Sequence, residues 1–76
     1  MPHVIVKLLV GRSEQKKADI AAAITKAVMA TADCAEKSVS VSIEDIAPDA
    51  WTEQVFKPDI IAKPDLLYKK PGYDPL

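Results

Sequence analysis

The sequence predicts an α/β protein: one βαβ unit followed by short C-terminal helices. Three observations lead to this fold class. Apolar and β-branched residues fill positions 2–10, an alanine-rich helix-forming stretch runs to about residue 31, and positions 38–43 alternate serine with an aliphatic residue. A strand, a long helix and a second strand within about 45 residues favour two parallel strands joined by a right-handed crossover.

The first predicted strand covers residues 2–10 and ends at Gly11. Side chains of a strand alternate between its faces, so Val4 lies on one face and Ile5 on the other. Both faces carry aliphatic side chains along this strand. We therefore expect both faces to be covered, with another subunit as a candidate cover for one of them.

The predicted helix begins at Ser13, whose hydroxyl can accept a hydrogen bond from an unpaired amide of the first turn. Ile20, Ile24 and Val28 recur at a spacing of four residues and form an apolar stripe along it. The helix is expected to end near residue 31, and residues 33–37 to connect it to the second strand.

The second predicted strand, residues 38–43, has the clearest pattern in the chain. Val39, Val41 and Ile43 face one way, and the three serines between them face the other. This alternation predicts a strand that is buried on one face only.

The last third of the chain is less regular. Pro48, Pro58 and Pro64 each precede an aspartate. Such a pair suits the first turn of a helix, so each proline is predicted to begin a short helix. The first of these helices would carry Trp51 and Phe56.

The size of the chain predicts self-association. It has 76 residues, 49% of them hydrophobic, which we interpret as a single domain spanning residues 1–76. A domain this small has a limited core, and a two-stranded sheet is marginal on its own. Two βαβ units that pair would form a four-stranded sheet with helices on one face. We therefore expect at least a dimer.

Composition excludes several classes of function. Ten Lys and Arg residues against eleven Asp and Glu residues give a net charge of -1, so no basic face is expected for nucleic acid or for an anionic membrane. No apolar run approaches the roughly 18 residues that cross a bilayer. Without a signal segment at its start, the chain is expected to be cytoplasmic, with neither nucleic-acid nor membrane partners.

Cysteine and histidine are too scarce for a disulfide or a zinc site. Cys34 is the single cysteine and His3 the single histidine. We expect no cofactor and no metal. We expect Cys34 to be a small, buried or semi-buried residue without a catalytic role.

Pro2 is the first candidate for chemistry. Initiator methionine is normally removed before a small residue such as proline, which would leave a secondary amine at the start of a strand. An α-amino group titrates near 8 in model peptides, and desolvation or a nearby cation favours its neutral form. A general base works best with a pKa near the working pH. The structural alternative is that Pro2 only begins an edge strand, where its missing N–H is tolerated.

Arg12 is the second candidate. It is the only arginine and stands in the predicted turn between strand and helix. Its guanidinium can bind a carboxylate through two parallel hydrogen bonds, next to the positive end of the helix dipole. The alternative is a solvated loop arginine.

The sequence combines Pro2, the turn Gly11-Arg12-Ser13, the helix opening at Glu14 and the strand at 38–43. In these features, over roughly residues 2–56, it resembles the 4-oxalocrotonate tautomerase family. The closing stretch, with Trp51, Phe56 and residues 69–73, is similar to the small bacterial phenylpyruvate-type tautomerases of that family.

The resemblance implies an isomerase that interconverts the enol and keto forms of a 2-keto acid without a cofactor. By this resemblance, Pro2 is the general acid/base and Arg12 binds the substrate carboxylate or 2-keto group. Trp51, with Phe56 as a second candidate, would form an aromatic wall that excludes water. The family also implies assembly as a dimer or a hexamer.

Ser40 departs from the family pattern. The archetype has a second arginine in the second strand, where this chain has Ser40. A dicarboxylate would lose one of its two binding groups there, so an arylpyruvate-like monocarboxylate is favoured, with Ser40 kept as a candidate substrate contact. The alternative is a non-catalytic oligomeric protein that binds a small ligand on the same fold. Retention of Met1 would favour it, because the Pro2 nitrogen would then be an amide.

Overall fold

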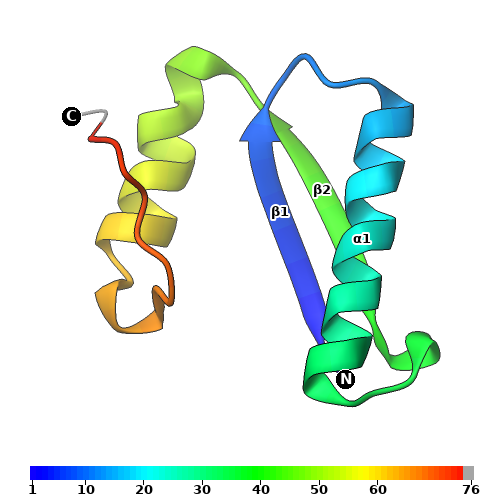
Figure 1. The fold of residues 1–76 in the computed structure, drawn as a ribbon. Helices are drawn as coiled ribbons and strands as arrows, with labels where there is room; N and C mark the ends of the chain where they lie inside the picture. The colour runs from blue at the N-terminus through cyan, green and yellow to red at the C-terminus, as the bar shows by residue number, and fades with distance from the viewer. Residues whose placement is uncertain (75–76) are drawn as a thin grey trace.

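The computed structural model describes residues 1–74 and is built on a βαβ unit (Figure 1). Its elements are β1 (His3–Leu9), α1 (Glu14–Ala32) and β2 (Ser40–Ile46). The two strands are parallel and hydrogen-bonded to each other, from His3 opposite Ser40 to Leu9 opposite Ile46. The predicted βαβ fold is confirmed.

Helix α1 begins where the sequence predicted it. Ser13 is the N-cap, and its hydroxyl accepts a hydrogen bond from the Lys16 amide at 3.1 Å. Just before it, Gly11 has a φ of +124°, which glycine adopts without the steric cost of a Cβ. This conformation turns the chain from β1 into the helix. Asp33, with a φ of 54°, ends α1.

Replacing Ser13 with alanine should lower the free energy of unfolding by about 1 kcal/mol, because the Lys16 amide loses its acceptor. Urea denaturation at one fixed protein concentration measures this change. Ser42→Ala is the matched control, since Ser42 is exposed in the middle of β2. Equal losses in the two variants would contradict the capping role.

Helix α1 covers one face of the sheet (Figure 1). The half-buried side chains of Val4, Val41 and Ile43 share this face. Lys17 of α1 forms an ion pair with Asp45 of β2 at 2.8 Å, which ties the helix to the end of the strand.

The C-terminal segment lies on the opposite face. It contains η2 (Pro48–Ala50), η3 (Thr52–Ile61) and η4 (Pro64–Leu66). Lys7 of β1, whose side chain points away from α1, forms an ion pair with Asp59 of η3 at 2.5 Å. This contact joins the segment to the sheet.

The structure corrects one helix start. Pro48 and Pro64 begin short 3₁₀ helices as predicted, but Pro58 lies inside η3. Helix η3 is a π-helix, in which the Ala62 amide donates to the Lys57 carbonyl five residues back at 3.0 Å. In an α-helix the proline ring would clash with the carbonyl four residues earlier, and the wider turn of a π-helix relieves that clash.

The second strand is also shifted from its predicted position at 38–43. Residues Glu36–Ser38 form the 3₁₀ helix η1, and β2 continues through Glu44 and Asp45 to Ile46. The acidic pair is accommodated in the strand because the Asp45 carboxylate is paired with Lys17.

One chain has a small core. Among residues 1–74 only three side chains are buried, those of Ile46, Val55 and Phe56. The accessible surface is 5742 Å², against roughly 4,600 Å² for a compact monomer of this mass. The radius of gyration is 13.8 Å, against roughly 11 Å for a compact chain of this length. The surplus surface is comparable to what one partner contributes to a stable protein interface.

Exposed aliphatic side chains include Ile5 and Leu9, on the face of β1 that points away from α1. None of the helices within residues 1–74 has the length and apolar character that a membrane span requires.

Candidate active site

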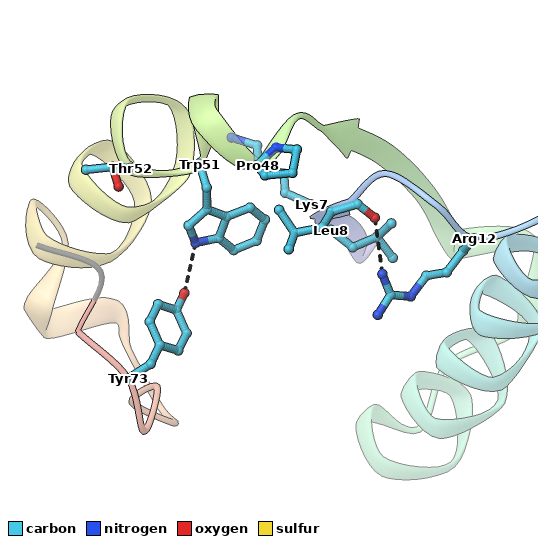
Figure 2. Close-up of a pocket in the computed structure, with 8 residues that line it drawn as sticks. Lys7, Leu8, Arg12, Pro48, Trp51, Thr52 and Tyr73 are labelled. Atoms are coloured by element: carbon cyan, nitrogen blue, oxygen red, sulfur yellow. Dashed lines mark hydrogen bonds between the residues drawn. The ribbon is translucent and has the colours of Figure 1, made fainter.

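Two of the predicted site residues, Arg12 and Trp51, meet in one pocket. This pocket has a volume of about 610 Å³ and lies between the end of β1, the turn after it and the C-terminal segment. Figure 2 shows Arg12 on one side of it and Trp51 with Tyr73 on the other. We call it the Arg12–Trp51 pocket; its lining includes Lys7, Leu8, Leu9, Arg12, Trp51 and Tyr73.

The Arg12 side chain is held by one hydrogen bond to the backbone. One terminal guanidinium nitrogen donates to the Leu9 carbonyl at 3.1 Å. Within residues 1–74, no carboxylate forms an ion pair with Arg12. A guanidinium has five N–H donors, so several remain available for an anionic ligand.

Trp51 forms the opposite, aromatic side of the pocket. It follows η2 directly and is half-buried. Its indole Nε1 donates a hydrogen bond to the Tyr73 hydroxyl at 3.0 Å. The pocket therefore combines a cationic group with an apolar ring, the combination that an aromatic carboxylate needs.

Lys7 also lines the pocket, but its charge is already engaged. The hydrogen bond to Asp59 raises the pKa of Lys7; desolvation opposes this, and the charges of Asp59 and Glu44 reinforce it. Lys7 therefore stays protonated at neutral pH. It offers the pocket neither a neutral amine base nor an unpaired cation.

Pro2 and Ser40 lie at the other end of β1. The Ser40 amide donates to the Pro2 carbonyl at 3.2 Å, and the Ser40 hydroxyl is hydrogen-bonded to Nδ1 of His3 at 2.6 Å. Strand β1 has seven residues, which at about 3.3 Å per residue places its ends roughly 20 Å apart. In Figure 1 the N-terminus and the turn after β1 lie at opposite ends of the sheet. A single chain therefore does not bring Pro2 or Ser40 to Arg12.

Phe56 lies outside the lining of this pocket. It is only 4% exposed, and its ring packs against that of Tyr73 with the centroids 5.9 Å apart. The structure thus places Phe56 in the core of the C-terminal segment, where it supports Tyr73.

Sequence reasoning did not single out Tyr73 as a site residue. It lies 22 residues after Trp51, and no local periodicity connects the two. The sequence shows only that Trp51 and Tyr73 are two aromatic residues beyond the predicted strands. This does not indicate that their side chains touch or how they are oriented.

The cysteine and potential metal ligands lie elsewhere. Cys34 is half-buried just beyond α1, as predicted, with its Sγ 3.9 Å from the Val28 carbonyl oxygen. In the part of the chain that the structure describes, no three His, Cys, Asp or Glu side chains are arranged to hold a metal ion.

Comparison with known proteins agrees with this fold. Residues 2–55 match the family described as tautomerase enzyme. A probable tautomerase of Xylella fastidiosa (strain 9a5c) is 38% identical over 76 residues, which are 100% of this chain and 93% of that protein. Tautomerase PptA of Escherichia coli O127:H6 is 34% identical over 74 residues, which are 96% of this chain and 97% of that protein.

Solved structures show the same relationship. The crystal structure of TomN, a 4-oxalocrotonate tautomerase homologue in the tomaymycin biosynthetic pathway, is similar with a TM-score of 0.64 and 36% identity. The similarity covers 66% of this chain and 77% of TomN. From the family match, the full-length relatives and the shared fold, we conclude that this chain belongs to the tautomerase family of enzymes and is an isomerase.

Proposed function

We propose that this protein interconverts the enol and keto forms of a 2-keto acid, with an arylpyruvate-like monocarboxylate as the substrate class. The observation that carries this proposal is the position of Arg12, which faces Trp51 across one pocket and has no carboxylate partner in residues 1–74. The guanidinium would bind the carboxylate, and the indole would contact the aromatic ring. One unpaired cation suits one carboxylate, because Asp59 already neutralises Lys7.

In this proposal the Pro2 amine is the general acid/base. Removal of Met1 would free it as a secondary amine. It would take the proton of the enol hydroxyl and deliver a proton to the adjacent carbon as the C=C electrons form the new C–H bond. Arg12 would stabilise the negative charge that develops on oxygen. The step uses neither a metal nor an organic cofactor.

The complete site would then need two chains. Roughly 20 Å of strand separates Pro2 from Arg12 within one chain, so Pro2 of one chain would act on a substrate held by Arg12 and Trp51 of another. The small core and the surplus surface support such self-association. We propose a dimer with a joined four-stranded sheet, or a hexamer built from such dimers.

The test is the ultraviolet decay of a freshly prepared arylpyruvate enol, with protein whose intact mass shows that it begins at Pro2. Wild-type protein should accelerate ketonisation. Arg12→Ala should lower kcat/KM roughly ten- to hundredfold. KM should rise because the carboxylate loses a charge-assisted partner, and kcat should fall because the negative charge that develops on oxygen is less stabilised. Lys16→Ala removes one positive charge from the exposed first turn of α1 and should leave kcat/KM unchanged.

Two results would contradict the proposal. Equal losses in the two variants would mean that Arg12 acts only through overall charge. If the protein binds the arylpyruvate but the enol decays no faster than in buffer, the alternative of a small-ligand-binding protein without this activity is favoured.

A further inference from the structure

Tyr73 connects the C-terminal segment to the Arg12–Trp51 pocket. Its hydroxyl oxygen accepts the hydrogen bond from Nε1 of Trp51 at 3.0 Å, and Figure 2 shows this bond at the edge of the pocket. Its ring packs against Phe56, with the two ring planes inclined by 40°. Phe56 belongs to the buried core, so the Tyr73 ring, itself 47% exposed, is packed against that core on one side.

This arrangement fixes the indole. Rotation about the two side-chain torsions of Trp51 decides which surface of the ring faces the pocket. The indole N–H is the only polar group of that side chain, and its bond to Tyr73 selects one orientation. Tyr73 lies beyond residues 2–55, which match the tautomerase family.

We propose that Tyr73 is a positioning residue that sets the affinity of the pocket for aromatic acids by holding the Trp51 ring opposite Arg12. The inference rests on the proposed function, because it assigns Trp51 to the substrate ring. A ring that is oriented before the ligand arrives loses less conformational freedom on binding. Loss of the tyrosine hydroxyl therefore weakens the binding of an aromatic acid even though Tyr73 does not react.

The orientation can be tested without turnover. Trp51 is the only tryptophan of the chain, so a ¹H–¹⁵N spectrum contains one indole signal. Tyr73→Phe keeps the ring on Phe56 and removes only the acceptor oxygen. The indole signal should move upfield, and its proton should exchange faster with water. Tyr68→Phe is the matched control, since Tyr68 is fully exposed, and it should leave the signal in place. An unmoved signal in Tyr73→Phe would overturn the proposal.

Binding of 3-phenylpropionate, an aromatic acid without a 2-keto group and therefore without a keto–enol pair to interconvert, tests the consequence. The Kd should rise roughly two- to tenfold in Tyr73→Phe, the effect of one lost hydrogen bond, and stay unchanged in Tyr68→Phe. Equal Kd values in wild type and Tyr73→Phe, or no binding to wild type, would overturn the proposal. Failure of the proposed function gives a different result. In that case 3-phenylpropionate still binds more weakly to Tyr73→Phe than to wild type, while wild-type protein does not accelerate the decay of the arylpyruvate enol.

Discussion

Mixing Pro2→Ala chains with Arg12→Ala chains should restore about one quarter of the wild-type tautomerase activity. If each site takes Pro2 from one chain and Arg12 from another, random assembly leaves both residues intact in about one site of four. Alone, Pro2→Ala should lose up to roughly 10²-fold in kcat/KM, the low end of the contribution of a general acid/base, because removal of Met1 leaves a primary amine in place of the secondary amine. We expect this restoration because Pro2 comes just before β1 and Arg12 comes after its end, so the length of the strand separates them within one chain.

The experiment is enol decay after equal amounts of the two variants have been unfolded and refolded together. The matched control mixes Pro2→Ala with the Pro2→Ala/Arg12→Ala double variant, a mixture in which no site has an intact Pro2. That mixture should show no more activity than Pro2→Ala alone, because half of its sites also lack Arg12. If the first mixture shows only the mean of its two components, the two residues act from the same chain, and the proposed two-chain site is wrong.

The midpoint of urea unfolding should fall when the protein is diluted. Within residues 1–74, a single chain buries only Ile46, Val55 and Phe56, and it exposes more surface than a compact monomer of its mass. Much of the stability should therefore come from contact between chains. By mass action, a dimer loses about 2.7 kcal/mol of apparent stability for a hundredfold dilution.

Circular dichroism at two protein concentrations about a hundredfold apart measures this change in stability. Ser13→Ala serves as an internal reference, since a lost helix cap should lower stability equally at both concentrations. An identical wild-type midpoint at both concentrations would contradict self-association as the source of stability.

Features set by neighbouring residues could be predicted from the sequence. The cap at Ser13 needs only a hydroxyl three residues before an amide, and the face of β2 needs only the alternation of serine with valine and isoleucine. Both are confirmed. The separation of Pro2 from Arg12 was also implicit, because the length of a predicted strand fixes the distance between its ends.

Features set by distant or unusual contacts could not be predicted. Pro58 suggested a helix start by its usual preference, whereas the π-helix tolerates it in the interior. Past Glu44, β2 includes Asp45, which forms an ion pair with Lys17, 28 residues away in the sequence. Tyr73 reaches Trp51 only because the C-terminal segment folds back along η3, and no local pattern encodes that return.

The Arg12–Trp51 pocket is formed by one chain, whereas the proposed base comes from another. A single chain would therefore be enough to bind an acid, whereas converting the acid would require an assembly of at least two chains. A solitary chain that keeps this fold would hold a carboxylate between Arg12 and Trp51 and release it unchanged. The same chain in an assembly would convert it. The enzyme and the small-ligand-binding protein would then be two concentration-dependent states of one molecule, and bound substrate would favour association if it contacts both chains.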